Sequence, residues 1–177
     1  LRSLLDNASS KDIYNFYVLE TNLSSTYKKQ LTSMVTGNNK ISFVNVTKKL
    51  EKLSYKLTTR DYYTISTYYR IFIPELFPNM DKCLYLDCDI VILDNIAKLY
   101  KTFLGNNLVG AARDEVLSLN DAFKEYADLT VGVGHMKYFN AGILLMNLKE
   151  MRKTNFFDKF LELLEEIRTI LSYSSGD

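Results

Sequence analysis

Residues 84–95, LYLDCDIVILDN, set two aspartates into an otherwise apolar run. An apolar run of this length predicts a buried strand, but two ionised carboxylates so close together repel each other and are costly to bury. Three arrangements would remove the conflict: one carboxylate stays protonated, the pair lies at a strand end, or a cation lies between Asp87 and Asp89. A divalent cation with oxygen ligands, Mn²⁺ or Mg²⁺, suits the third arrangement best.

The Asp-x-Asp pattern is weakly informative without its setting. With 12 aspartates in 177 residues, about one such pair is expected by chance from composition alone. The setting is more specific, because the pair directly follows the apolar residues 82–86. A strand-end turn with solvated aspartates is the alternative interpretation of the same residues.

The remainder of the chain alternates apolar strand-like runs with helical periodicity. Strands are predicted at 12–20, 41–46, 82–93, 107–113 and 138–148. Helices are predicted from Ser24 or Ser25 to Gly37 and at 58–76, 95–103 and 155–171, with a partly helical connection after Asp114. Strands that are apolar on both faces and alternate with helices predict an α/β fold, an open, mostly parallel sheet with helices on both faces. Ligands of such sheets bind at the carboxyl ends of the strands.

The composition is that of one globular domain, with 47% hydrophobic and 24% charged residues. A net charge of +1 gives no general attraction to nucleic acid or to an anionic membrane. No stretch has the length and apolarity of a transmembrane helix. Cys83 and Cys88 lie five residues apart on one predicted strand, where a disulfide between them is geometrically unfavourable. Reduced thiols favour a cytoplasmic location.

Several stretches together resemble glycosyltransferase family 8, which includes glycogenin and bacterial lipopolysaccharide galactosyl- and glucosyltransferases. The resemblance begins near residue 12 and runs to the end of the chain. It rests on YLDCDIVILDNIAKLY (85–100) and YFNAGILLMNL (138–148), supported by YYRIFIPELFP (68–78), NLVGAARDE (107–115) and the final GD (176–177). The final pair is similar to the start of an Asp-Gln motif near the family's acceptor pocket.

The resemblance implies a nucleotide-diphospho-sugar transferase fold of type A. It also implies a UDP-sugar donor, Mn²⁺ (or Mg²⁺) as cofactor, and transfer of a hexose with retention of anomeric configuration to a glycan or another hydroxyl acceptor. Asp87 and Asp89 would bind the metal that bridges the donor diphosphate, with Asp89 the more direct ligand. Asp87 would also face the ribose or sugar of the donor. By family alone, the acceptor would be a bacterial cell-surface glycan, as in lipopolysaccharide biosynthesis.

The resemblance assigns further residues to the donor site. Arg70 matches an arginine that approaches the donor, although a helix-surface salt bridge would also explain it. Asp114 matches an acidic residue that hydrogen-bonds sugar hydroxyls, and its alternative is a helix N-cap. Asn140 suits adjacent hydroxyls because its amide donates and accepts, and Ala141 and Gly142 leave room for a ligand near the backbone.

Compared with the family, the chain is expected to be a single catalytic domain over 1–177, truncated at both ends. It starts in what resembles the helix after the family's first strand, so an exposed sheet edge is expected. Asp177 or the residue after it would be the one to probe for the retaining mechanism. The family's histidine ligand lies beyond this point, so His135 is not expected to bind metal. The fragment is expected to lack full activity, and any peripheral membrane association would involve the absent C-terminal part.

Two other interpretations stay open at this level. Haloacid-dehalogenase-like phosphatases also end a strand in Asp-x-Asp, and there Asp87 would be the nucleophile and Asp89 the acid/base. Their motif lies near the start of the domain, whereas 86 residues precede it here. A non-catalytic domain that binds a sugar nucleotide would need the same ligand-binding residues.

Overall fold

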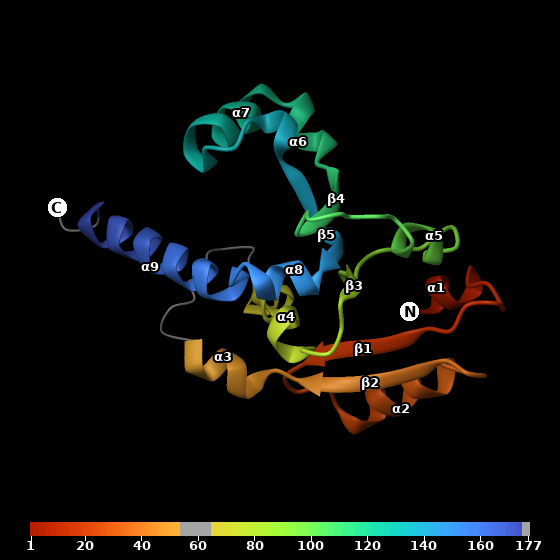
Figure 1. The fold of residues 1–177 in the computed structure, drawn as a ribbon. Coiled ribbons are helices and arrows are strands. Elements are labelled where there is room, and N and C mark those ends of the chain that lie inside the picture. The colour runs from red at the N-terminus through yellow and green to blue at the C-terminus, as the bar shows by residue number, and fades with distance from the viewer. Residues whose placement is uncertain (54–64, 175–177) are drawn as a thin grey trace.

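The computed structural model describes residues 1–53 and 65–174, in which strands and short helices alternate (Figure 1). The strands are β1 (Asn15–Glu20), β2 (Lys40–Asn45), β3 (Lys82–Leu86), β4 (Val109–Arg113) and β5 (Phe139–Asn147). The α-helices are α1 (Arg2–Asp6), α2 (Ser25–Met34), α3 (Thr47–Leu53), α4 (Ile73–Leu76), α5 (Ala97–Tyr100), α6 (Glu115–Leu119), α7 (Asp121–Glu125), α8 (Leu148–Lys153) and α9 (Phe156–Ser174). The 3₁₀ helices are η1 (Ile65–Phe72) and η3 (His135–Lys137), and η2 (Tyr126–Val131) is a π-helix.

Each predicted strand is present in the described residues, and so are most of the predicted helices. Ser24 caps α2 by accepting a hydrogen bond of 3.3 Å from the backbone nitrogen of Tyr27. The helix predicted at 58–76 is confirmed for its described part, which forms η1 and then α4, while residues 58–64 lie outside the described ranges.

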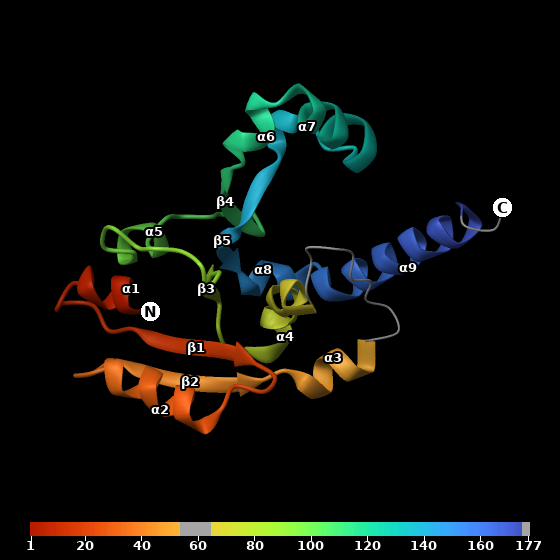
Figure 2. The ribbon, with the colours of Figure 1, turned by 180° about the vertical axis from the view of Figure 1, so that it is seen from behind.

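The strands form two sheets with different pairing. β1 and β2 are parallel, whereas β3 and β4 both pair antiparallel with β5 in the order β3-β5-β4. The α/β class is confirmed, but the expectation of mostly parallel pairing is wrong for the second sheet. The segment from α6 to η3 starts at the carboxyl end of β4 and enters β5 at the same end of the sheet. β5 therefore runs antiparallel to β4. Figure 2 shows this segment at the far end of the two strands.

The strand predicted at 82–93 is too long, because β3 ends at Leu86. Further along this run, Ile92 bonds to the N-terminal segment rather than to the sheet. The backbone nitrogen of Ile92 donates to Ser3 Oγ at 3.0 Å, and Asn7 Nδ2 donates to the Ile92 carbonyl at 3.0 Å. The aspartate pair therefore lies at a strand end, which is the second of the three arrangements that the sequence allowed.

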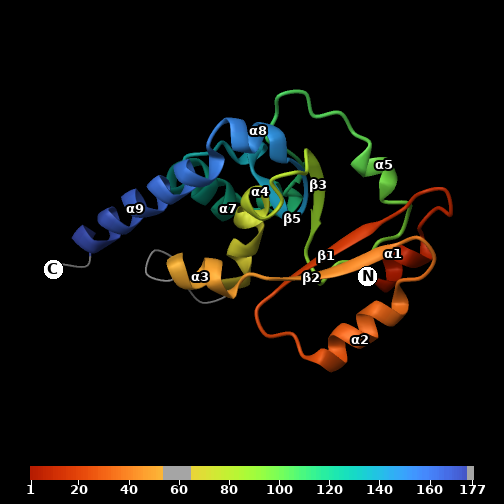
Figure 3. The same ribbon diagram turned by 60° about the horizontal axis from the view of Figure 1, so that its bottom comes forward.

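Helices flank the strands on both sides (Figures 1 and 3). α2 lies on one side of the β1–β2 pair, and α4 and α8 lie on the other. Leu19 of β1 packs against two buried clusters, which joins the two sheets through the core. The first cluster is Ile73, Leu144, Met146, Leu148 and Met151, and the second is Val46, Leu50 and Phe72. Each buried aliphatic or aromatic side chain contributes roughly 1.5–3 kcal/mol to folding.

Arg152 of α8 fixes the loop between α4 and β3. Its guanidinium donates to the carbonyls of Phe77 at 3.1 Å and Met80 at 2.7 Å. These are charge-assisted bonds, which are stronger than bonds between neutral groups. The placement of η1 and α4 relative to β3 is thereby set.

The two cysteines are free thiols, as expected from their spacing. Burial raises the pKa of the Cys83 thiol to about 12, whereas Cys88 is exposed. Across the described residues, none of the helices combines the length and apolarity needed to span a bilayer.

Candidate active site

The carboxyl end of β3 meets the amino end of β5, and this junction brings distant residues together. Leu86 pairs with Ile143, and the backbone nitrogen of Asp87 then donates to the Gly142 carbonyl at 2.8 Å. Asp87 and the segment 140–142 therefore lie side by side, although more than 50 residues separate them in sequence. The sequence prediction that these residues form one site is consistent with this placement.

Arg70 reaches the same junction from η1. Its Nη2 lies 3.1 Å from Asp87 Oδ1, its Nη1 donates to the Ala141 carbonyl, and its Nε donates to the Thr67 carbonyl at 3.1 Å. The Arg70 side chain is only 13% exposed. Arg70 does form a salt bridge, but its partner is Asp87, the first residue of the candidate metal pair, and not a residue on the surface of its own helix. The guanidinium thus connects η1, β3 and β5 at one point.

Tyr85 is a member of this cluster that the sequence interpretation missed. Its hydroxyl donates to Asp87 Oδ1 at 2.5 Å, and the Arg70 guanidinium carbon lies 4.7 Å from its ring centroid. Burial, and then the hydrogen bond to Asp87, raises the pKa of the Tyr85 hydroxyl. The sequence contained a signal, since residues two apart on a strand point to the same face, but Tyr85 was counted only as an apolar strand residue.

Gly142 supplies the space that the Asp87 carboxylate occupies. A Cβ at this position would lie 3.0 Å from Asp87 Oδ2 and 3.0 Å from Asn140 Oδ1. Asn140 Oδ1 also accepts from the Gly142 backbone nitrogen at 2.8 Å. Within the described residues the amide nitrogen of Asn140 has no hydrogen-bond partner. It is therefore available to a ligand at the junction.

Asp89 differs from Asp87 in its surroundings. Its side chain is exposed, and it makes no hydrogen bond or ion pair with the part of the chain that the structure describes. Asp87 is neutralised by Arg70 and is 32% exposed. The two neighbouring carboxylates are therefore tolerated because the Arg70 guanidinium neutralises Asp87 and because Asp89 is exposed.

The aspartate pair fits a divalent cation only with help from other ligands. Among residues 1–53 and 65–174, no three acidic, histidine or cysteine side chains gather into a metal-binding group. Mg²⁺ and related cations are commonly held by one or two carboxylates together with water and substrate phosphates. Asp87 and Asp89 can supply these two carboxylates. Arg70 and Tyr85 both bond to Oδ1 of Asp87, so its Oδ2 is the oxygen left for a cation.

The other predicted site residues have different positions. Asp114 follows the carboxyl end of β4, which lies at the same end of the sheet as the carboxyl end of β3. Its Oδ1 accepts from the Val116 backbone nitrogen at 3.1 Å, as the capping alternative predicted. Its contact with a sugar stays a prediction, and Asp177 lies outside the described residues. His135 is paired with Asp128, with Nδ1 2.9 Å from the carboxylate.

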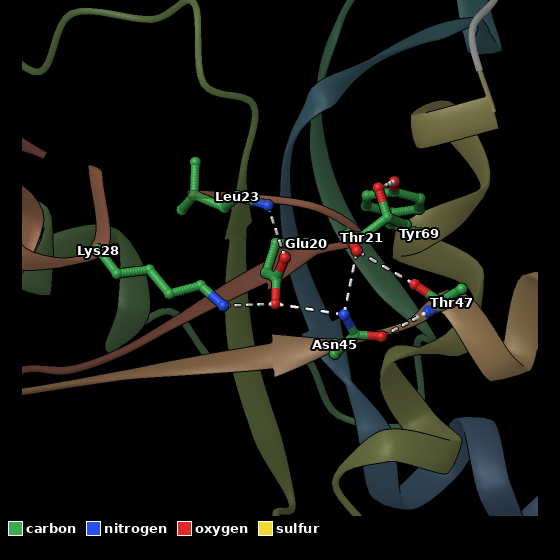
Figure 4. Close-up of polar contacts among 7 residues, drawn as sticks. All are labelled: Glu20, Thr21, Leu23, Lys28, Asn45, Thr47 and Tyr69. Atoms are coloured by element: carbon green, nitrogen blue, oxygen red, sulfur yellow. Dashed lines mark hydrogen bonds and ion pairs between the residues drawn. The ribbon is translucent and has the colours of Figure 1, made fainter. Parts of the chain in front are cut away.

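A second polar cluster lies at the carboxyl ends of β1 and β2 (Figure 4). Glu20, which is 7% exposed, accepts from Lys28 Nζ at 2.9 Å and from the Leu23 backbone nitrogen at 2.9 Å. The Tyr69 hydroxyl donates to Thr21 Oγ1 at 3.3 Å. Since protein groups satisfy this cluster, we interpret it as structural. Tyr69 connects η1 to the end of β1, whereas the next residue, Arg70, reaches the β3–β5 junction.

Comparison with known proteins places this geometry in a family. The model of the family described as Glycosyl transferase family 8 matches residues 1–177. The chain belongs to that family. A Haemophilus influenzae protein named as a glycosyltransferase is 27% identical over 177 residues, which cover 99% of this chain and 51% of that protein.

Solved structures of two glycosyltransferases agree with the fold. The bifunctional glycosyltransferase WbbM, without ligand, has a TM-score of 0.76 at 29% identity and covers 91% of this chain and 30% of its own. The structure of the galactosyltransferase LgtC in complex with donor and acceptor sugar analogues has a TM-score of 0.72 at 26% identity. The match covers 93% of this chain and 59% of the LgtC chain. The fold is thus that of the type A glycosyltransferases, and the chain spans about half of the Haemophilus relative.

Proposed function

We propose that the protein transfers a hexose from a UDP-sugar to a hydroxyl group of a glycan, in a metal-dependent reaction. The observation that carries the proposal is the junction of Arg70, Asp87 and Asn140 at the carboxyl end of β3. Membership of a glycosyltransferase family supplies the reaction class. The LgtC structure holds donor and acceptor sugar analogues, which supports a sugar donor and a sugar acceptor for the present protein as well.

The chain's own residues account for donor binding. Arg70 presents a planar guanidinium, whose geometry suits a diphosphate or two neighbouring hydroxyls. Asn140 can offer its amide nitrogen to a hydroxyl while its oxygen stays bonded to the Gly142 nitrogen. The absence of a side chain at Gly142 lets the Asp87 and Asn140 side chains lie against the backbone there.

Asp87 and Asp89 would hold the cation, Mn²⁺ or Mg²⁺. When bound, such a cation stabilises the negative charge that develops on the leaving diphosphate. Asp89, exposed and unpaired within the described residues, contributes a full negative charge, whereas Arg70 offsets that of Asp87. Retention of configuration, with Asp114 and Asp177 near the reacting sugar, is part of the proposal and rests on the family resemblance.

The test is release of UDP from UDP-glucose and UDP-galactose by the full-length protein with Mn²⁺. We expect UDP release that chelation of the metal abolishes and that Asp89→Ala reduces by at least about 100-fold, as expected when one of two ligands is lost. Asp94→Ala is the matched control, because Asp94 is an exposed aspartate nearby that, among the described residues, pairs with Lys98 and with the backbone nitrogen of Asn95. No UDP release from either donor, or equal rates for the Asp89 and Asp94 variants, would reject the proposal. Donor binding without release would instead favour the non-catalytic interpretation.

A further inference from the structure

Tyr85 and Asp87 form the shortest hydrogen bond between two side chains at the junction, and nothing in the proposed reaction accounts for Tyr85. Both lie on one face at the end of β3, where Tyr85 pairs with Leu144 and the Asp87 nitrogen bonds to Gly142. The O–H···O distance of 2.5 Å is that of a charge-assisted hydrogen bond to a carboxylate. Tyr85 therefore reaches the candidate metal ligand directly through its hydroxyl.

Two donors converge on one oxygen of Asp87. Oδ1 accepts from Tyr85 at 2.5 Å and from Arg70 Nη2 at 3.1 Å. An ionised carboxylate has about four acceptor positions, two on each oxygen, so these two bonds use the capacity of Oδ1. Oδ2 receives no hydrogen bond from the described residues and lies against Gly142, where a Cβ would be only 3.0 Å from it.

The Tyr85 ring also supports Arg70. The guanidinium carbon lies 4.7 Å from the ring centroid, a cation–π distance. Each of Tyr85, Asp87 and Arg70 thus contacts the other two: a hydrogen bond joins Tyr85 to Asp87, an ion pair joins Asp87 to Arg70, and a ring contact joins Arg70 to Tyr85. The rotation of each side chain therefore depends on the other two. A carboxylate held in this way cannot turn without breaking two bonds.

We propose that Tyr85 is a positioning residue that fixes the rotation of the Asp87 carboxylate and reserves Oδ2 for the cation. This inference rests on the proposed function, because it concerns the same cation. Partners that orient a metal ligand in this way commonly change metal affinity by 10–100-fold when they are removed. The hydroxyl carries the effect, whereas the ring serves Arg70.

The test is Mn²⁺ binding to the full-length protein in the presence of UDP, measured by electron paramagnetic resonance of the free ion. Tyr85→Phe keeps the ring and removes the hydroxyl, and we expect the dissociation constant of Mn²⁺ to rise by about 10-fold or more. Tyr14→Phe is the matched control, since Tyr14 is a part-buried tyrosine whose hydroxyl donates to Asn95 Oδ1 at 2.9 Å, away from the junction. It should change the dissociation constant by less than about 2-fold, because it removes a bond that touches no metal ligand.

A double-mutant cycle separates positioning from a general loss of structure. In an Asp87→Ala background, Tyr85→Phe should have almost no further effect on Mn²⁺ affinity, because the carboxylate that it positions is gone. Equal Mn²⁺ affinity of wild type and Tyr85→Phe overturns the inference and leaves the proposed function standing. Absence of Mn²⁺ binding by the wild-type protein contradicts both. If Tyr85→Phe does not fold, a crystal structure of the unliganded wild type decides: a Tyr85 hydroxyl beyond hydrogen-bond distance of both Asp87 oxygens overturns the inference.

Discussion

Replacement of Glu20 by glutamine tests whether the cluster at the ends of β1 and β2 stabilises the fold. The Glu20 carboxylate is 7% exposed and accepts from Lys28 Nζ and the Leu23 nitrogen, each at 2.9 Å. Glutamine keeps the shape and one acceptor, so the main loss is the charge-assisted bond to Lys28. A hydrogen bond to a charged group contributes about 1.5–3 kcal/mol. Because the Lys28 side chain is 34% exposed, water can replace part of this bond, and we expect a loss of about 2 kcal/mol.

This loss corresponds to a fall of roughly 4–8 °C in the midpoint of thermal unfolding for a chain of this size. The pH dependence provides an independent signature. The bond from Lys28, and then the bond from the Leu23 nitrogen, lowers the pKa of Glu20 below its usual value of 4.5. A carboxyl with a lowered pKa in the folded state stabilises the fold above its unfolded pKa and loses this contribution as the pH falls through its folded value.

The assay is urea unfolding followed by circular dichroism between pH 7 and pH 3. The difference between wild type and Glu20→Gln should be full at pH 7 and should shrink below about pH 4.5, where the unfolded carboxyl becomes protonated. Asp94→Asn is the control, since it removes the same charge from an exposed i, i+4 pair with Lys98 and should leave the midpoint unchanged. Equal stability of wild type and Glu20→Gln at pH 7, or a difference that persists undiminished to pH 3, would refute the reasoning.

Two further predictions concern the junction and the thiols. Gly142→Ala places a Cβ 3.0 Å from Asp87 Oδ2 and Asn140 Oδ1 and should lower UDP release by about 10-fold, because both side chains must shift by a few tenths of an ångström and a shift near 1 Å costs about 100-fold. Gly134→Ala, whose new Cβ would lie 4.0 Å from Asp128 Oδ1, should retain full activity, and equal rates for the two variants would contradict the role of Gly142. Iodoacetamide at pH 8 followed by peptide mass spectrometry should label Cys88 and spare Cys83, whose pKa of about 12 leaves almost no thiolate. Comparable labelling of both in the folded protein would show that Cys83 is not buried as described.

Local patterns in the sequence predicted the elements better than their pairing. Apolar runs located each of the five strands in the described residues, and helical periodicity located α9. The direction of β5 could not be predicted, because it depends on where the α6–η3 segment returns rather than on β5 itself. The end of β3 at Leu86 could not be predicted either, because residues 90–93 continue the apolar run, whereas Ile92 bonds to Ser3 of α1 instead of the sheet.

The site was predictable where motif and strand end coincide. The resemblance brought Arg70, Asp87 and Asn140 to one place, and the structure has them at one junction. Tyr85 and Glu20 were missed for the same reason. Each lies in a strand, and its role comes from a partner that local sequence does not specify: the Arg70 guanidinium above the Tyr85 ring, and Asn45 of the neighbouring strand beside Glu20.

The central claim is that the junction of β3 and β5 is the site of a metal-bound donor. Anomalous X-ray scattering from Mn²⁺ in crystals of the full-length protein grown with UDP tests it most directly. The account predicts one Mn²⁺ at coordination distance from carboxylate oxygens of Asp87 and Asp89, with the diphosphate also bound to the metal and close to Arg70. UDP bound elsewhere on the protein, or Mn²⁺ that contacts neither aspartate, would contradict it.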